Sequence, residues 1–433
     1  MTPAQECARA APVVVVALFG ACFSPTAPEG LECAGTEEPA CPGGMSCEGD
    51  FKCRLDSFAQ DDDATLIAES FHGPRLLVAP GGDVFVVGRD ATTLQAWRLT
   101  EDDQTLVREV EMGINADPLS ATFSDELNEI AVLYRGEADS LWLARIGIAA
   151  TASPENVPLD LAEPGRVERS TVRAAYYPVE GVTHLGTVWR TLDQRKWFCL
   201  FDLGGDKADD CILVELQPDQ KSDLNTNGII FDRDRVMIVA SPLGLGEAVL
   251  YPVVCSGADP VSCAPGADRK GLATDMLHTS VLAVDDGYVL AGLVDGARAL
   301  KYLPPEGDPK PFEIDPRTSP LTPNGRSPAI AWNGSILAVA WRLKRTDGVI
   351  DVYVRYFPLA PSSTTDEAFT PVCDAQRVTT AANHSAYDRP QIVWSESAGK
   401  FVLLWQDSRG SENDGFGDDE DTYVKFLDPS DCP

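Results

Sequence analysis

Five arginines open loops at similar places in a repeated apolar pattern: Arg89, Arg135, Arg190, Arg342 and Arg409. Guanidinium groups bind carboxylates and sulfates through paired N–H donors. If the loops gather on one face of the fold, these arginines could converge on an anionic ligand. The other interpretation is that each arginine caps its own repeat, and the spacing alone leaves both open.

A second candidate site is a run of oxygen-bearing side chains at alternate positions. Asp223, Asn225 and Asn227 are followed by Gly228, as in the first half of an EF-hand calcium loop, and Asp234 holds the twelfth position. Aspartate is shorter there than the usual bidentate glutamate, and strand patterns flank the run in place of helices. The segment is therefore either a structural calcium loop between strands or an asparagine-rich turn without metal.

Residues 410–421 form the most acidic loop, GSENDGFGDDED, which could bind calcium or remain solvated. Signatures of catalysis are missing from the sequence. It contains no G-x-S-x-G elbow and no phosphate-cradling G-x-x-x-x-G-K loop. A carboxylate pair for glycoside cleavage is not marked by any spacing. We expect no cofactor apart from the calcium considered above.

The elements that position these residues repeat seven times between residues 84 and 426. In each repeat an apolar run ends on a small or aromatic residue, and a polar loop leads to a second run containing an aromatic residue. Successive run ends lie 46 to 64 residues apart. Repeats of several short strands at about this period are typical of β-propellers. The sequence predicts an all-β fold, a seven-bladed β-propeller, with six blades as the alternative.

Within each repeat we expect four strands, the first nearest the axis. In the sixth repeat the first two are expected at Pro328–Trp332 and Ser335–Trp341. A type I′ turn at Asn333-Gly334, with positive φ at both residues, should join them. The last repeat lacks a fourth strand of its own. The alternating segment 63–70 is expected to supply it, which would remove an open sheet edge.

The two late repeats resemble a repeat of secreted bacterial β-propellers. Their sequences are RPQIVWSESAGKFVLLWQDSR…DTYVKF and SPAIAWNGSILAVAWRLKR…IDVYVRY. The shared pattern is P-x-h-x-W, a turn, an apolar strand ending W-x-D-x-R, and then D-h-Y, where h is apolar. The resemblance implies the fold and says nothing about a ligand. Sialidases use an arginine cluster on a propeller, but this chain lacks their S-x-D-x-G-x-T-W box.

Composition limits the partners and the compartment. Asp and Glu number 67 against 35 Lys and Arg, a formal charge of −32, which disfavours nucleic acid and anionic lipid headgroups. The chain has 12 cysteines and no Cys-x-x-Cys pair. Disulfides in an oxidising space are therefore expected. Outside the N-terminal region the expected bridges are Cys199–Cys211, Cys255–Cys263 and Cys373–Cys432.

The N-terminal apolar run, residues 10–21, has the length of a signal-peptide core. It ends at Leu18-Phe19-Gly20-Ala21-Cys22, which resembles the lipobox of bacterial lipoproteins and implies lipid attachment at Cys22. An ordinary signal cleavage near the same place is the alternative. We expect a signal peptide at 1–21, a tether at 22–32, a Cys-rich module at 33–57 and the propeller at 58–433.

The Cys-rich module carries four cysteines in residues 33–53 and cannot bury a core, so disulfides must hold it. Three pairings are open from the sequence alone. The run resembles short C…CPxGxxCxxGxC modules that follow the leader of bacterial secreted lipoproteins. That resemblance implies the pairs Cys33–Cys47 and Cys41–Cys53. A rigid spacer is the expected role, and a small receptor-like binding module is the alternative.

Two functional classes follow. In the first, the protein belongs to the cell envelope, either anchored by a lipid to the outer membrane or secreted. It is a monomer whose propeller binds a protein or glycan ligand. In the second, an extracytoplasmic, sialidase-like hydrolase or lyase acts on carbohydrate at the mouth of the ring. The first is favoured, because catalysis needs positioned acid, base or nucleophile groups and no repeat gains one. Whether the protein is an enzyme is left open by the sequence.

Overall fold

The computed structural model describes most of the strands and some of the loops between them. The described residues are 45–47, 53–55, 64–68, 71–90, 92–101, 103–111, 117–135, 141–148, 155–159, 172–179, 181–190, 196–202, 210–212, 229–232, 235–240, 249–257, 262–266, 270–271, 276–284, 287–294, 297–303, 310–313, 328–344, 350–359, 371–379, 390–407 and 421–431. No helix among them is long and apolar enough to cross a membrane.

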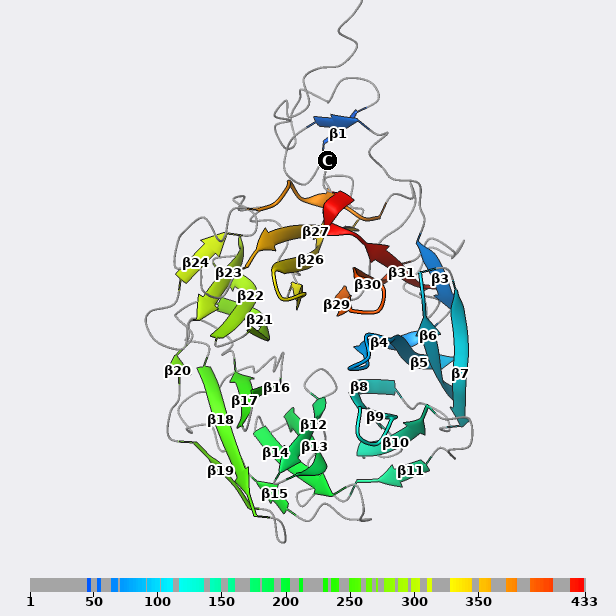
Figure 1. Cartoon of the computed structure of the whole chain (residues 1–433), viewed down its shortest axis with the longest axis vertical. Coiled ribbons are helices and arrows are strands. Elements are labelled where there is room, and N and C mark those ends of the chain that lie inside the picture. The colour runs from blue at the N-terminus through cyan, green and yellow to red at the C-terminus, as the bar shows by residue number, and fades with distance from the viewer. Residues whose placement is uncertain are drawn as a thin grey trace, which may run out of the picture.

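The described strands form a two-stranded hairpin and seven larger sheets (Figure 1). The hairpin pairs β1 (Met45–Cys47) with β2 (Cys53–Leu55), within the Cys-rich segment. The first three larger sheets, in chain order, have four strands each. They are β4 (His72–Val78), β5 (Val84–Asp90), β6 (Thr93–Leu99) and β7 (Gln104–Glu111); β8 (Asp117–Ser124), β9 (Glu129–Arg135), β10 (Leu141–Gly147) and β11 (Glu155–Pro158); and β12 (Arg173–Val179), β13 (Val182–Arg190), β14 (Lys196–Asp202) and β15 (Asp210–Ile212).

The remaining four sheets continue the pattern, and the last takes its outer strand from the other end of the chain. They are β16 (Ile229–Asp232), β17 (Arg235–Ala240), β18 (Val249–Ser256) and β19 (Ser262–Pro265), with β20 (Lys270–Gly271) also on β18; β21 (Met276–Val284), β22 (Gly287–Val294), β23 (Ala297–Leu303) and β24 (Lys310–Glu313); β25 (Ala329–Trp332), β26 (Ile336–Lys344), β27 (Ile350–Pro358) and β28 (Gln376–Arg377); and β29 (Gln391–Ser395), β30 (Lys400–Asp407), β31 (Asp421–Leu427) and β3 (Thr65–Ala68). A short 3₁₀ turn, η6 (Pro429–Asp431), follows β31.

The sheets are arranged around a common centre in the manner of propeller blades (Figure 1). Within each sheet the neighbouring strands are antiparallel, and the first strand lies innermost. Each first strand contacts the first strand of the next sheet, and β29 in turn contacts β4. The architecture is therefore nearly all-β and propeller-like, as the repeat spacing predicts.

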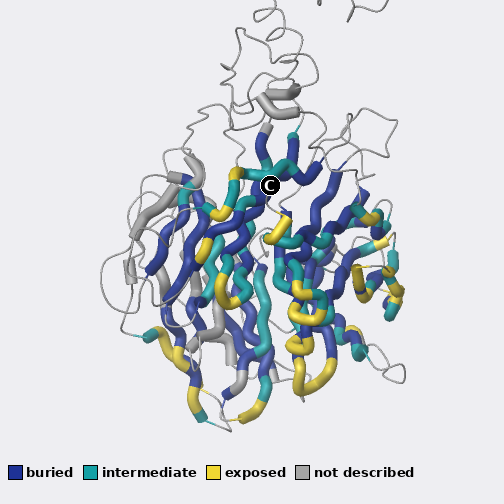
Figure 2. Tube along the Cα trace, turned by 45° about the horizontal axis from the view of Figure 1, so that its top comes forward, coloured by how far each residue is buried: buried dark blue, intermediate teal, exposed yellow. Residues whose placement is uncertain are grey.

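The second strands are deeply buried where the structure describes them, because a neighbouring sheet covers each of their two faces. All but the last two residues of β5 and the last residue of β9 are buried, as are all residues of β30 after the first. Figure 2 shows buried residues along the strands and exposed residues at many of the turns. Apolar clusters join adjacent sheets: Tyr356 of β27, for example, packs with Phe401 of β30.

The segment expected to complete the last sheet does so. Residues Thr65–Ala68 form β3, which pairs with β31 as the outermost strand of that sheet. Side chains strengthen the seam between the last and first sheets. Gln391 Nε2 donates to the carbonyl of Pro74, and Ser395 and Ser397 Oγ both donate to the carbonyl of Gly82.

The expected turn in the sixth repeat is wrong in type. Gly334 has a φ of 97°, but among described non-glycine residues only Asn128 has a positive φ, so Asn333 does not. The loop is three residues long, 333–335. The Asn333 side-chain oxygen accepts hydrogen bonds from the backbone N–H groups of Ser335 and Ile336. This Asx turn replaces the I′ geometry, because the amide side chain supplies the turn's hydrogen bonds from a negative φ.

Candidate functional site

The loop face is the end of the sheets at which second strands pass into third strands, and aromatic pairs support it. Tyr134 stacks on Trp142, with ring centroids 6.2 Å apart, and Trp341 on Tyr353 at 6.0 Å. Trp405 stacks on Tyr423, also at 6.0 Å. Each pair joins directly opposite residues of the second and third strands. The aromatic residues with which the apolar runs end therefore stack against the third strands and hold the two ends of each loop together.

In the last sheet the aromatic pair supports two buried carboxylates. Asp407 lies directly opposite Asp421 in the β30–β31 ladder. Asp407 is fully buried and accepts a hydrogen bond of 2.9 Å from Trp405 Nε1. Asp421 is 7% exposed and accepts one of 3.4 Å from the Tyr423 hydroxyl. These are the aspartates of the W-x-D and D-h-Y patterns, which the sequence marked only as fold signatures.

The equivalent aspartate of the sixth repeat, Asp351, is also fully buried. Its Oδ1 accepts a hydrogen bond of 3.1 Å from the hydroxyl of Thr379, which itself accepts one from the backbone N–H of Val352 at 3.0 Å. Asp351 therefore ties the start of the third strand to the segment after the fourth strand. The repeat aspartates act as internal hydrogen-bond acceptors, and water does not reach Asp351 or Asp407.

Four of the five candidate arginines occupy one structural position. Arg89, Arg135, Arg190 and Arg342 each follow the aromatic or small residue near the end of a second strand: β5, β9, β13 and β26. In the last sheet that position belongs to Gln406, which lies opposite Thr422 just as Arg342 lies opposite Val352. Arg409 comes three residues later and lies outside the described residues. The sequence reasoning grouped it with the other four, and the strand register separates it.

Gln406 shows what this position can reach. It is buried, and its Nε2 donates a 2.8 Å hydrogen bond to the carbonyl of Phe71, at the entry to the next sheet. Arg89 and Arg342 are only partly exposed, and their Nε atoms are inaccessible to solvent. All four arginines lie in different sheets, one strand out from the centre. Their convergence on one anion stays a prediction.

The candidate calcium ligands Asp223, Asn225, Asn227 and Asp234 lie outside the described residues, as does the acidic loop before Asp421. In the part of the chain that the structure describes, no group of three or more His, Cys, Asp or Glu side chains is arranged to hold a metal ion. The lipid-attachment cysteine Cys22 is also outside that part.

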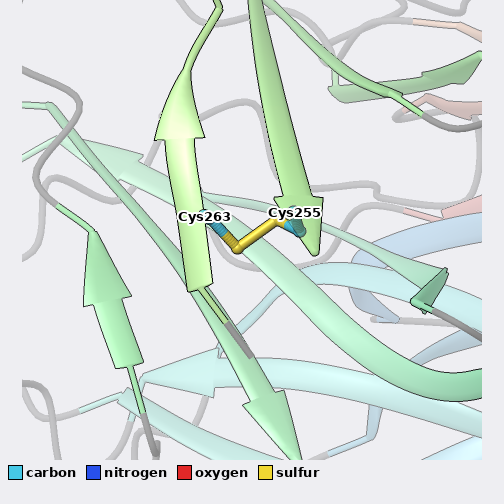
Figure 3. Close-up of a disulfide and its surroundings, with 2 residues drawn as sticks. All are labelled: Cys255 and Cys263. Atoms are coloured by element: carbon cyan, nitrogen blue, oxygen red, sulfur yellow. A yellow bond between two sulfur atoms is a disulfide. The ribbon is translucent and has the colours of Figure 1, made fainter. Parts of the chain in front are cut away.

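Disulfides hold outer strands. The expected bridge between Cys255 and Cys263 joins β18 to β19 (Figure 3). Cys199 is disulfide-bonded, and the residue opposite it in the ladder is Cys211. Cys373 is also disulfide-bonded, while its expected partner, Cys432, lies outside the described residues. In the Cys-rich hairpin Cys47 lies opposite Cys53, and Cys33 and Cys41 are not described, so that module's pairing stays a prediction.

A polar cluster that the sequence did not mark links the second and third sheets. Arg145 donates two hydrogen bonds to the carboxylate of Glu129, at 3.0 and 3.1 Å. The Tyr176 hydroxyl, on the first strand of the next sheet, donates a third at 2.9 Å. Burial, together with the Glu129 carboxylate, raises the pKa of Tyr176 far above its usual value. Glu129 lies at the start of β9, away from the loop face, so this cluster stabilises the contact between sheets.

Comparison with known proteins gives a fold likeness only. No protein-family model and no curated protein matches the sequence. The chain resembles hydrazine synthase of Kuenenia stuttgartiensis at 12% identity, covering 77% of this chain and 92% of that one, with a TM-score of 0.49. It resembles the WD40 domain of SCAP from fission yeast at 11% identity, covering 85% of this chain and 100% of that one, with a TM-score of 0.45. It resembles the propeller of Dos1 at 10% identity, covering 79% of this chain and 75% of that one, with a TM-score of 0.43.

Proposed function

We propose that the chain is a seven-bladed β-propeller of the cell envelope that acts as a binding or scaffold module. Its loop face presents variable loops to a protein or glycan ligand. The closed ring of seven blades is part of this proposal, and the cyclic contacts of the first strands and the β3–β31 pair support it. A ring of this kind is a rigid platform on which loops can vary without loss of the core.

The observation that carries the proposal is the burial of the three repeat aspartates at the loop face. Asp351, Asp407 and Asp421 are buried and accept hydrogen bonds from side chains of their own sheet or of the segment after it. A general acid or base must come within hydrogen-bond reach of a substrate, and these carboxylates face protein instead. Binding needs only exposed loops of unequal length. Those on this face range from residues 91–92 between β5 and β6 to residues 408–420 between β30 and β31.

A glycan array and a pull-down with the full exported chain test the proposal, with and without calcium. One variant replaces residues 410–420 by a short glycine–serine linker. The control, Leu127→Ser, changes an exposed side chain in the β8–β9 turn at the opposite end of the sheets. We expect the loop variant to lose at least tenfold in ligand affinity and the control to bind normally. Equal binding by both variants, or turnover of any sugar on the array, would overturn the proposal.

We also propose that Cys22 carries a lipid that anchors the protein to the membrane. The support is the Leu18–Cys22 sequence, which resembles a lipobox. Feeding the expressing bacterium an alkyne-tagged fatty acid should label the wild-type protein and leave Cys22→Ser unlabelled. The wild type should fractionate with membranes. An unlabelled wild-type protein in the soluble extracytoplasmic fraction would show ordinary signal cleavage instead.

A further inference from the structure

The outer edge of β31 binds a short extended segment, and this edge is called the seat below. The strand β3 occupies it through three backbone pairs, Thr65 with Val424, Leu66 with Tyr423 and Ala68 with Thr422. A side chain from the first sheet adds to the seat, since Gln104 Nε2 donates a 3.0 Å hydrogen bond to the carbonyl of Leu66. The seated backbone is therefore held from two sheets.

Two apolar clusters flank the seat. Ile67, 5% exposed, enters a cluster between the last and first sheets that includes Val402, Leu404 and Val424. Leu66 packs on the other side, against the cluster shared by the sixth and last sheets. Successive residues of a strand point to opposite faces, so the seat accepts two consecutive apolar residues in an extended segment.

The present occupant is held less firmly than the strands around it. The β3–β31 ladder has three pairs and a register irregularity between Leu66 and Ala68, whereas β30 and β31 share seven regular pairs. Only one side chain of β3, that of Ile67, is buried, and Thr65 is exposed. Few buried contacts and a short ladder are the features of a segment that opens locally.

The chain is fixed again immediately after β3, so this strand can leave alone. Phe71 is fully buried, and its carbonyl accepts a 2.8 Å hydrogen bond from Gln406 Nε2. A Cβ on Gly88 would lie 2.4 Å from the Phe71 ring, so the ring rests directly on that glycine. Release of residues up to 70 therefore leaves the first sheet anchored at Phe71.

The charge around the seat favours a different occupant. In the sequence, β3 is preceded by Asp61-Asp62-Asp63 and followed by Glu69. Asp103, whose carboxylate is exposed, directly precedes Gln104, which binds the β3 backbone, whereas the nearby Glu101 is paired with Lys400. Acidic flanks beside this acidic neighbour on a chain of charge −32 are repulsive. Basic flanks would be attractive.

We propose that the edge of β31 is a strand-binding site that β3 fills within the chain. In its place the site takes an extended segment of a partner protein with two consecutive apolar residues and basic flanks. Strand addition of this kind gains affinity from main-chain hydrogen bonds and specificity from alternate side-chain pockets. The chain's own strand competes at an effective concentration on the order of millimolar. Partner binding is therefore coupled to the release of β3. This inference goes beyond the proposed function, because it uses an outer strand edge and not the loop face.

Peptide binding to the full chain tests this. The variant Ile67→Asp unseats β3, because burying a carboxylate in the apolar cluster around Ile67 is unfavourable. Thr65→Asp is the matched control, since Thr65 is exposed in the same strand. The probes are labelled peptides: DATLIAES, the chain's own sequence, then KKTLIAKS with basic flanks, and KKTLDAKS as the negative control.

We expect KKTLIAKS to bind the Ile67→Asp chain at least tenfold more tightly than DATLIAES at low salt. This preference should shrink at 0.5 M salt, where the Debye length is only a few ångströms (about 4 Å). The Thr65→Asp and wild-type chains should bind at least tenfold more weakly, and KKTLDAKS should not bind. Equal binding of all three peptides, or none to the Ile67→Asp chain, would refute the proposal. Concentration-dependent dimers of the wild type would show that the occupant is a second copy, which also overturns it.

Hydrogen exchange of the wild-type chain gives a second readout that needs no variant to fold. The amides of Thr65–Ala68 that pair with β31 should exchange at least a hundredfold faster than those of β30. The β30–β31 amides should stay protected at the same time. Exchange of β3 only together with β30 would mean that the strand never opens alone, and the site would then be inaccessible.

Discussion

Gly82 provides the sharpest test of how the last sheet is joined to the first. It lies in the turn between β4 and β5 with a φ of 85°, a conformation that costs an L side chain about 1–2 kcal/mol. A Cβ there would also lie 2.4 Å from the backbone nitrogen of Ser397 and 3.0 Å from the Cβ of Glu396. Neither atom is the end of a flexible side chain, so the β29–β30 turn would have to move.

That movement breaks specific bonds. The Gly82 carbonyl accepts hydrogen bonds of 2.8 Å from both Ser395 and Ser397 Oγ, each worth about 0.5–1.5 kcal/mol. Overpacking adds about 1–3 kcal/mol. With the backbone strain, we expect Gly82→Ala to lower the free energy of unfolding by about 4 kcal/mol.

Two other glycines separate these contributions. Gly181 has the same φ of 85°, and a Cβ added there would meet no atom within 4 Å, so Gly181→Ala should cost only the backbone strain, about 1 kcal/mol. Gly81 has neither feature, and Gly81→Ala should change the free energy by less than about 0.5 kcal/mol. Urea unfolding followed by tryptophan fluorescence measures all three variants. If Gly82→Ala and Gly181→Ala agree within about 0.5 kcal/mol, the seam at Gly82 is not rigid and the reasoning fails.

Three further predictions concern a charge, a phenol and a disulfide. Arg145→Leu, which leaves the nearly buried Glu129 carboxylate without its bidentate partner, should cost about 3 kcal/mol in urea unfolding. Arg98→Leu removes an exposed pair with Asp83 and should cost under about 1 kcal/mol, so equal costs would contradict the role of burial. Burial raises the pKa of Tyr134 to about 12, whereas the unfolded chain loses this proton near pH 10. Stability should therefore fall as the pH rises from about 10 to 12, and Tyr134→Phe should flatten that part of the profile; an unchanged profile would argue against it. Replacing both Cys255 and Cys263 by serine should cost about 2–3 kcal/mol and speed amide exchange in β19, with β17 unaffected; unchanged exchange in β19 would show that the bridge does not hold that strand.

Much of the fold follows from patterns that are local in the sequence. The apolar pattern predicts the second strand of the sixth repeat at Ser335–Trp341, and β26 spans Ile336–Lys344. It also predicts that the segment 63–70 completes the last sheet, and that segment contains β3. Alternation of apolar residues fixes which face of a strand is buried, and the repeat period fixes which strands share a sheet. Both can be read without knowing any distant contact.

The candidate site could be predicted only in part from the sequence. The sequence identified the arginine position, but it could not show that Gln406 takes that position in the last sheet, because only the ladder aligns Gln406 with Arg342. It also marked the aspartates of the repeat without their role. Asp351 meets Thr379 across 28 residues of chain, and no local pattern encodes that contact.

What the sequence determined by itself is the all-β repeat, its spacing and the Cys255–Cys263 bridge, because each depends on residues near one another along the chain. The tertiary structure decided which side chains form the contacts between the sheets. Gly82 and Ser397 are 315 residues apart and become neighbours only because the first and last sheets meet. Phe71 rests against Gly88, and Gln406, which is 335 residues further along the chain, reaches the Phe71 carbonyl only because the same two sheets meet. Sequence pattern specifies the face a residue presents, whereas packing between distant segments specifies what that face meets.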